Sequence, residues 1–150
     1  MFALLNLFLF AAGVVLFVVT GFLFLEVIAS FGARAPGDVP ERPRRRIGVI
    51  IPAHNEQEIV AATVAAIRAE LRDIDRLVVV ADNCDDETAA RARADGADAI
   101  ERKDHEKRGK GYALQYGVDH LRGDPPDIVV FIDADCRPAP GAIARITARA

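Results

Sequence analysis

The chain contains 150 residues, of which 51% are hydrophobic and 27% are charged, and its net charge is −3. That length has room for one domain, or for one domain and a membrane anchor. A net charge of this size does not imply a nucleic-acid partner, and none is expected. The two cysteines, Cys84 and Cys136, form no CxxC pair, which excludes the usual zinc-finger spacing and fits a reducing compartment.

The N-terminal segment is almost entirely apolar. No ionisable side chain occurs between Phe2 and Leu25. A helix over this stretch is about 36 Å long at about 1.5 Å per residue, enough to cross a hydrocarbon core of about 30 Å. A cleaved signal peptide is the alternative, but it requires a basic region before a shorter apolar run, and no Lys or Arg precedes this one. Residues 1–30 are therefore predicted to form a transmembrane helix.

A basic segment follows the apolar run. Residues 31–45 contain prolines among charged side chains, which is typical of a linker. Because the basic residues are concentrated on this side of the run, the positive-inside rule places the following domain in the cytoplasm and the N-terminus outside. The same side chains can contact anionic lipid headgroups. They are Arg34, Arg42, Arg44, Arg45 and Arg46.

Strand and helix signals alternate through residues 46–150. Short apolar runs at residues 47–51, 77–81, 99–102 and 128–132 predict strands, and helical periodicity is found between them. The strands are continuously apolar, which favours a parallel sheet covered by helices on both faces. The alternating order of strands and helices indicates a doubly wound α/β fold.

Several helix boundaries are also predicted. Asn55 and Glu58 have the spacing of a capping box for the first helix of the soluble part. Asp85 and Asp86 are interpreted as caps of the next helix. Residues 141–150 predict the opening of a further helix that has no terminal cap, so we expect the chain to be the front part of a longer protein.

Polar and mostly acidic residues follow the first, second and last predicted strands, at residues 52–56, 82–86 and 133–135. Ligands of parallel open sheets bind outside the carboxyl ends of the strands, so these segments are expected to meet. Asp133 and Asp135 project to the same side of an extended segment and can share Mg²⁺ or Mn²⁺, the alternative being acidic caps of a loop. For Asp82, a hydrogen bond to a base or ribose and a turn-forming role are equally compatible with the sequence.

The segment Arg108-Gly109-Lys110-Gly111 precedes a predicted helix. Its glycines let the backbone approach a ligand, and its cations together with a helix N-terminus suit a diphosphate, the alternative being a solvated basic loop. No Ser or Thr follows the lysine and no GxGxxG follows a strand, so neither a Walker A loop nor a nicotinamide or flavin cofactor is expected. Ser30, the only serine, lies at the end of the anchor, which excludes a Ser-His-Asp site. His54 is interpreted as a turn or capping residue.

Taken in order, four segments resemble the motifs of family 2 glycosyltransferases, which have the A-type nucleotide-sugar-binding fold. The resemblance extends from residue 47 to about residue 138, nearly all of the soluble part, and the order and spacing of the motifs make it specific. The N-terminal helix is also similar to that of membrane-bound polysaccharide synthases in this family. The segments are Ile50-Ile51-Pro52-Ala53-His54-Asn55-Glu56, Val79-Val80-Ala81-Asp82-Asn83-Cys84-Asp85-Asp86-Glu87-Thr88, Arg108-Gly109-Lys110-Gly111-Tyr112-Ala113-Leu114 and Phe131-Ile132-Asp133-Ala134-Asp135.

The resemblance implies a role for individual side chains in these segments. Asp82 is expected to contact the uracil or equivalent base, and the loop with Glu56 to line the nucleoside. Lys110 and Arg108 are expected near the base and diphosphate. The donor-binding residues that it implies are Pro52, Ala53, Asn55, Glu56, Asp82, Arg108, Lys110 and Asp133. It also implies that Asp133 and Asp135 form the site for Mg²⁺ or Mn²⁺, with Asp135 as the direct ligand of the ion.

The resemblance further implies a metal-dependent, inverting glycosyltransferase that uses a nucleotide-diphosphate sugar such as a UDP-sugar. Its acceptor would be a glycan or a lipid-linked molecule at the membrane. The catalytic base of the family comes from an acidic motif well downstream of Asp135, so it is expected beyond residue 150 and the chain is expected to hold only the donor half.

Two other functions stay open. A membrane-tethered module that binds a nucleotide-sugar or supports assembly without catalysis would use the same donor half. A nucleotidyltransferase shares the α/β donor fold, but it would need a glycine-rich, arginine-bearing loop after the first strand, where this chain has residues 52–56.

Overall fold

The computed structural model describes residues 2–32 and 45–148. The chain forms two compact units, Met1–Asp38 and Val39–Ala150. Most of the predicted linker lies outside the described residues, and so do Arg34, Arg42 and Arg44.

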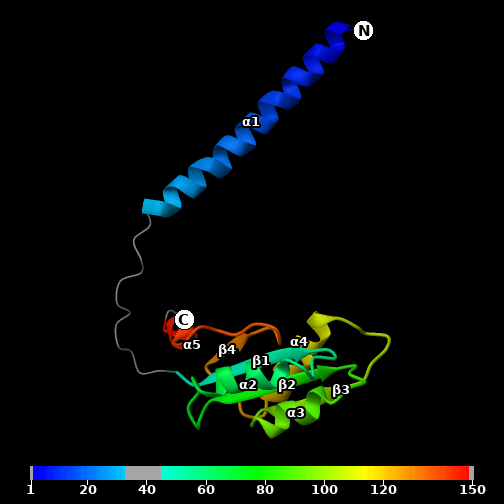
Figure 1. Ribbon diagram of the computed structural model, residues 1–150, viewed down its shortest axis with the longest axis vertical. Coiled ribbons are helices and arrows are strands. Elements are labelled where there is room, and N and C mark those ends of the chain that lie inside the picture. Colours follow the sequence, from blue (N-terminus) through cyan, green and yellow to red (C-terminus); the bar gives the residue numbers. More distant parts are fainter. Residues whose placement is uncertain (1, 33–44, 149–150) are drawn as a thin grey trace. The chain divides into compact units, whose positions relative to one another are not determined.

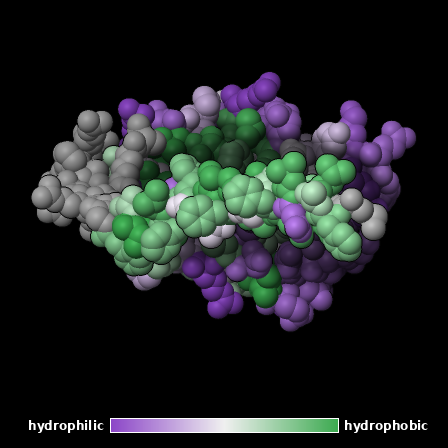
Figure 2. All heavy atoms as spheres, turned by 90° about the horizontal axis from the view of Figure 1, so that it is seen from above, coloured by the Kyte–Doolittle hydropathy of each residue, from purple (hydrophilic) through white to green (hydrophobic). Residues whose placement is uncertain are grey.

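The first unit contains one long helix, α1, which extends over Phe2–Gly32 (Figure 1). Its large apolar side chains are exposed. The side of the helix that Figure 2 shows is almost uniformly hydrophobic. By length and composition, residues Phe2–Phe31 can cross a membrane. The helix predicted for residues 1–30 is therefore present with nearly the predicted bounds.

The second unit is built on a four-stranded sheet with the order β3-β2-β1-β4. All neighbouring strands are parallel, as the apolar runs predicted. The strands are β1 (Ile47–Ala53), β2 (Arg76–Asp82), β3 (Asp98–Arg102) and β4 (Ile128–Phe131).

Strand β1 continues through Pro52, where the sequence predicted that it would stop. Pro52 pairs in register with Val80 of β2, whereas the register with β4 ends at Ile50 and Phe131. Residues 50 and 52 of a strand direct their backbone groups to the same neighbour, and Ile50 O accepts from Ile132 N at 3.1 Å. The N–H that proline lacks would therefore point to the side where β4 has already ended, so no ladder hydrogen bond is lost.

Helices cover both faces of this sheet (Figure 1). They are α2 (Val60–Arg68), α3 (Thr88–Ala94), α4 (Lys110–Leu121) and α5 (Ala142–Thr147). On one face, Val64 of α2, Ala92 of α3 and Ile143 of α5 belong to one core cluster with the odd-numbered residues of β1. On the other face, α4 packs on Ile50 and Val80. This two-faced α/β arrangement is the predicted fold class.

Gly117 allows helix α4 to pack directly against the sheet. A Cβ atom at this position would lie 2.7 Å from Ile50 Cγ2, which is too close for packed atoms, and a tight 3.0 Å from Val80 Cγ2. The N-terminus of α4 lies at the carboxyl ends of β1 and β2, where Gly109 and Lys110 line one cavity with Ala53 and Asp82. Strand β4, at the edge of the sheet, is covered less completely: Val129 and Phe131 are 37% and 50% exposed.

The predicted capping box at Asn55 and Glu58 is wrong. Helix α2 begins at Val60, and its N-cap residue, Ile59, makes no side-chain capping hydrogen bond. Asn55 instead adopts a left-handed conformation with φ of 54°, and its Oδ1 accepts a hydrogen bond from the backbone N of Asp85 at 2.9 Å. The side chain that the sequence assigned to its own helix is used by the loop after β2, because β1 and β2 are neighbours.

A buried carboxylate holds the beginning of the sheet. Asp75, 4% exposed, accepts hydrogen bonds from the backbone N of Ile47 at 3.0 Å and from the backbone N of Arg72 at 2.9 Å. The Arg72 guanidinium also donates to Asp75 Oδ1 at 3.1 Å. Burial alone raises the pKa of a carboxyl, but the hydrogen bonds from Arg72 and Ile47 outweigh it and lower the pKa of Asp75 to about 2.

We expect Asp75→Asn to lower the free energy of unfolding by roughly 1–2 kcal/mol at neutral pH, because the amide has one acceptor oxygen for donors that now share two. The folded-state pKa of Asp75, about 2, lies below the ordinary value of 3.8, so this stabilisation is complete above about pH 4 and is lost as the pH falls through 2. Urea unfolding followed by circular dichroism should show the free energies of unfolding of the unsubstituted chain and of Asp75→Asn converging as the pH falls from about 4 to about 2. Asp73→Asn, at an exposed position, is the control, and a difference that stayed constant down to pH 2 would contradict the assignment.

Candidate functional site

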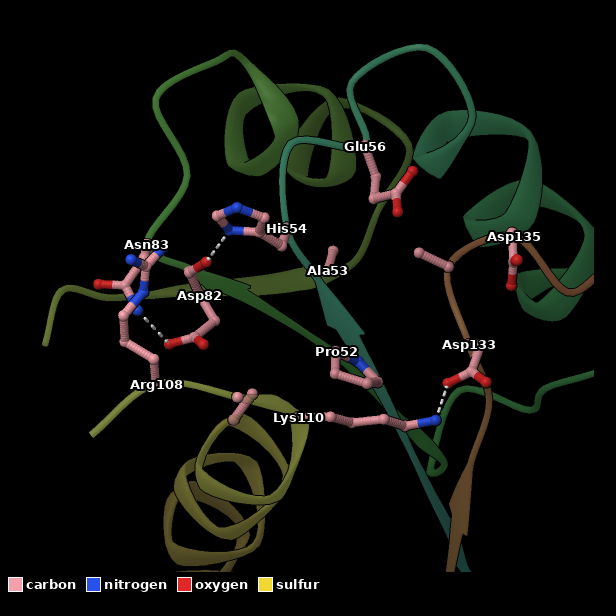
Figure 3. Close-up of a pocket in the computed structure, with 13 residues that line it drawn as sticks. Pro52, Ala53, His54, Glu56, Asp82, Asn83, Arg108, Lys110, Asp133 and Asp135 are labelled. Atoms are coloured by element: carbon pink, nitrogen blue, oxygen red, sulfur yellow. Dashed lines mark hydrogen bonds and ion pairs between the residues drawn. The ribbon is translucent and has the colours of Figure 1, made fainter. Parts of the chain in front are cut away.

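A cavity of about 570 Å³ lies at the carboxyl ends of β1, β2 and β4 and at the N-terminus of α4 (Figure 3). This is the edge of a parallel sheet at which ligands bind. Its lining residues are Pro52, Ala53, His54, Glu56, Asp82, Asn83, Arg108, Gly109, Lys110, Ala113, Asp133, Ala134 and Asp135.

All but one of the predicted donor and metal residues line this cavity. The exception is Asn55, whose side chain holds the loop after β2. Asp82 and Asp133, which come from different strands, therefore lie on the same cavity, as the common edge of a parallel sheet requires. Five further residues line the cavity that were not among the predicted donor-binding or metal residues, although each lies within one of the four motif segments: His54, Asn83, Gly109, Ala113 and Ala134.

The loop after β1 is tied to the loop after β2. Glu56 N donates to Thr88 Oγ1 at 2.8 Å, and Gln57 N donates to Asp86 Oδ2 at 3.2 Å. Asp86 also accepts from the backbone N of Thr88, the first residue of α3, at 3.0 Å, although the N-cap residue of this helix is Glu87 and neither Asp85 nor Asp86. Because two strand-end loops share these bonds, the wall of the cavity that carries Glu56 is fixed from both strands.

His54 faces the cavity from the first of these loops. Its Nδ1 lies 2.7 Å from the backbone O of Asp82. A carbonyl oxygen only accepts, so Nδ1 carries the proton and, in the neutral ring, Nε2 is left as an acceptor. The contact joins the ends of β1 and β2 at the cavity, so His54 links the two strands and is not a helix cap.

Asp82 ends β2 and is nearly buried, with 7% of the residue exposed. Its Oδ1 accepts from Arg102 Nη1 at 2.6 Å and from Asn83 Nδ2 at 3.1 Å. These hydrogen bonds offset the cost of removing a carboxylate from water. Arg102 and Asn83 therefore hold Asp82 in place through a single carboxylate oxygen, Oδ1. Figure 3 shows this carboxylate on the cavity wall below His54.

The basic segment opens α4 at the cavity. Helix α4 begins at Lys110, and its N-cap residue is Gly109, whose φ of 114° suits glycine and which has no side chain to cap the helix. A helix N-terminus carries a partial positive charge that favours an anion. Lys110 Nζ forms an ion pair with Asp133 Oδ1 across the cavity, and Arg108 lies on the side of Asn83 (Figure 3).

The two aspartates after β4 are held on a turn. Cys136 N donates to Asp133 O at 3.0 Å, and Thr63 Oγ1 of α2 donates to the backbone O of Ala134 at 2.6 Å. Thr63 is fully buried, whereas Asp133 and Asp135 are exposed to the cavity. The turn is thus anchored through its middle residue, and both carboxylates remain accessible.

These carboxylates fit a hexacoordinate hard cation that takes its other ligands from elsewhere. Among the described residues, no three His, Cys, Asp or Glu side chains gather as a complete metal cage. Mg²⁺ is commonly bound by one or two carboxylates together with phosphate oxygens and water, so Asp133 and Asp135 fit an ion that arrives with a phosphorylated ligand. They do not fit a structural zinc site, which needs four protein ligands.

Burial and hydrogen bonding shift the pKa values of two side chains in the loops near the cavity. Burial raises the pKa of the Cys84 thiol, so it is protonated at neutral pH and serves as a packed, neutral side chain. The backbone N–H groups of Lys107 and Glu106 lower the pKa of Asp104, which keeps this loop carboxylate charged.

The known proteins that this chain resembles are glycosyltransferases. The family model described as Glycosyl transferase family 2 matches residues 48–150. Among curated proteins, the glucosyl-3-phosphoglycerate synthase of Mycobacterium tuberculosis is 34% identical over 128 residues, covering 69% of this chain and 38% of that protein. The undecaprenyl-phosphate 4-deoxy-4-formamido-L-arabinose transferase of Klebsiella pneumoniae is 28% identical over 115 residues, covering 72% of this chain and 34% of that protein.

Solved structures agree with this fold. A crystal structure of the Mycobacterium tuberculosis synthase in complex with Mn²⁺, UDP-glucose and phosphoglyceric acid matches with a TM-score of 0.54 and 33% identity, covering 67% of this chain and 37% of that one. Another structure of the same synthase, with Mg²⁺ and UDP, matches with the same TM-score and coverage. The chain thus spans less than two-fifths of the length of these relatives.

We expect Thr63→Val to loosen the turn that carries Asp133 and Asp135. Valine keeps the shape of threonine but cannot donate to Ala134 O, and a buried acceptor without its donor costs about 1–3 kcal/mol. Backbone hydrogen exchange at residues 133–136 should accelerate by the factor that this loss of free energy implies. Thr147→Val is the matched control, because the buried Thr147 hydroxyl donates within its own helix, to Ile143 O at 2.8 Å. Equal exchange in both variants would show that Thr63 does not hold the turn.

Proposed function

Because this chain belongs to glycosyltransferase family 2, we propose that its second unit is the donor-binding part of a metal-dependent, inverting glycosyltransferase that uses a UDP-sugar. The observation that carries this proposal is the meeting of Asp82, Lys110 and the pair Asp133 and Asp135 on one cavity. Each comes from a different segment, and together they match the base, diphosphate and cation of a nucleotide-sugar. The complexes of the related synthase with UDP and Mg²⁺ or Mn²⁺ support this choice of ligand.

The nucleoside would lie between the ends of β1 and β2. Asp82 has its Oδ1 engaged by Arg102, and its second oxygen can accept a hydrogen bond from a base N–H. Pro52, Ala53 and Glu56 line the adjoining wall. Specific recognition follows because a buried acceptor strongly disfavours a base that offers no N–H at that point.

The diphosphate would lie toward the N-terminus of α4. Lys110 and Arg108 offer cationic groups, and the helix N-terminus adds its partial positive charge. Asp133 and Asp135 would hold Mg²⁺ or Mn²⁺, which when bound supplies Lewis-acid stabilisation of the charge that develops on the leaving nucleotide. Lys110 can exchange its partner Asp133 for the diphosphate, because both groups are more than half exposed.

Inversion at the sugar carbon requires a carboxylate base that deprotonates the acceptor hydroxyl on the face opposite the diphosphate. We place this base beyond residue 150, where the family resemblance puts its acidic motif. The acceptor that we propose is a glycan or a lipid-linked molecule at a membrane. Two observations support a membrane acceptor: the long apolar helix α1, and the similarity to the undecaprenyl-phosphate 4-deoxy-4-formamido-L-arabinose transferase.

We expect Asp135→Ala to remove the metal dependence of UDP binding. In the unsubstituted full chain, Mn²⁺ should strengthen UDP binding at least tenfold relative to chelator, because the cation joins the carboxylates to the diphosphate. Calorimetry with and without chelator should show this ratio falling to about one in the variant, while UDP alone binds as before.

Asp85→Ala is the matched control, since Asp85 is exposed and does not line the cavity. It should keep the full effect of Mn²⁺. A chelator-insensitive affinity in the unsubstituted chain would contradict the metal assignment.

We also propose that α1 crosses the membrane with the second unit in the cytoplasm. Replacing Val15 and Val19 together by Arg should release the chain from membranes washed with carbonate, since each Arg near the helix centre costs about 2.5–3.5 kcal/mol. The Val15→Leu and Val19→Leu pair should stay in the membrane fraction. Protease added outside intact cells should leave the second unit uncut, and cleavage there would reverse the proposed orientation.

A further inference from the structure

Arg102, the last residue of β3, reaches toward the cavity without lining it. Its Nη1 donates to Asp82 Oδ1 at 2.6 Å, and its Nη2 donates to Lys107 O at 2.6 Å and to Asp104 Oδ2 at 3.0 Å. The guanidinium carbon also lies 5.6 Å from the ring centroid of Tyr112, on α4. One side chain therefore contacts the end of β2, the loop after β3 and the first turn of α4.

The loop after β3 is folded around this side chain. Asp104 Oδ1 accepts from Glu106 N at 3.1 Å and Lys107 N at 2.9 Å, so the carboxylate that Arg102 holds also sets the path of the following backbone. Asn83, next to Asp82, closes the other side: its Oδ1 accepts from Asp104 N at 2.8 Å, and its N donates to Arg102 O at 2.7 Å. The loop leads directly to Arg108 and Lys110.

The ion pair of Arg102 and Asp82 is more deeply buried than the ion pair of Lys110 and Asp133. Both side chains are 10% exposed, whereas those of Lys110 and Asp133 are 57% and 52% exposed. A buried charge pair resists separation because removing one partner leaves the other charge without solvent. The planar guanidinium can satisfy several acceptors in fixed directions, which the lysine ammonium, as a point charge, cannot.

We propose that Arg102 is a positioning residue that couples the two ends of the donor site. It fixes the carboxylate of Asp82, which would read the base, and by the same guanidinium it fixes the loop that delivers Arg108 and Lys110 to the diphosphate. The proposal rests on the proposed function, since it assigns these groups to a UDP-sugar. Arg102 itself does not contact the donor; it acts through Asp82 and the loop.

The test is UDP binding to the full-length chain in detergent with saturating Mn²⁺, measured by calorimetry. Arg102→Lys keeps the charge but cannot bridge the three acceptors, and it should weaken UDP binding about tenfold or more. Arg93→Lys is the matched control, because Arg93 pairs with Glu101 at 2.8 Å from an exposed position away from the cavity. This control should bind UDP like the unsubstituted chain.

A double-mutant cycle separates positioning from a general loss of stability. If Arg102 acts through Asp82, Arg102→Lys should weaken UDP binding much less when Asp82 is already replaced by Asn than when Asp82 is intact. Additive losses would overturn the coupling to Asp82. So would an Arg102→Lys variant that unfolds more easily but binds UDP with unchanged affinity.

A second, milder change avoids any failure to fold. Tyr112→Leu removes the ring beside the Arg102 guanidinium at a position 49% exposed, and it should weaken UDP binding about twofold to fivefold. Tyr116→Leu, one turn later and 42% exposed, should have no effect. Equal affinities for these two variants would overturn the proposal, whereas failure of the unsubstituted chain to bind UDP with Mn²⁺ would overturn the proposed function itself.

Discussion

The parallel register of β1 with its two neighbours determines where the polar strand ends of the site lie. Ala53 pairs with Ala81, one residue before Asp82, and Ile50 pairs with Phe131, two residues before Asp133. Side chains that are distant in sequence therefore emerge from the same edge of the sheet. An antiparallel β1 would have sent its polar loop to the opposite edge, and no common cavity would exist.

Bringing acidic strand ends together creates repulsion that the structure must offset. Two carboxylates about 4 Å apart repel by roughly 1–4 kcal/mol, depending on the local dielectric. The two aspartates from different strands each have a cationic partner: Arg102 for Asp82 and Lys110 for Asp133. The two partners stand at the two ends of the connection between β3 and α4, so the path of this connection determines how Asp82 and Asp133 are paired.

The two ion pairs suit different tasks because they differ in exposure. The pair at Asp82 is nearly buried and is reinforced by Asn83, which is appropriate for a group that must keep its direction. The pair at Asp133 is open to solvent, where an ion pair is worth little and partners exchange readily. We interpret the first as a fixed wall for the nucleoside and the second as the part that rearranges when a diphosphate and a cation enter.

The sequence by itself determined the elements and the order of the polar segments along the chain. The apolar α1, the parallel strands and the acidic ends of β1, β2 and β4 were all predicted, because hydrophobic runs and charge are local properties. The end of β1 was placed too early, since a proline is tolerated only where the neighbouring strand has stopped, and that depends on the register.

Only the tertiary structure decided which side chain meets which. Asn55 binds the loop after β2 and not its own helix, Thr63 anchors Ala134 from 71 residues away, and Arg102 lies against Asp82. None of these partners is close in sequence, and each has several chemically equivalent alternatives nearby. Long-range hydrogen bonds depend on how the strands align and how closely the helices approach the sheet. The sequence therefore predicted most of the polar residues that line the cavity, but not the residues that hold them in place.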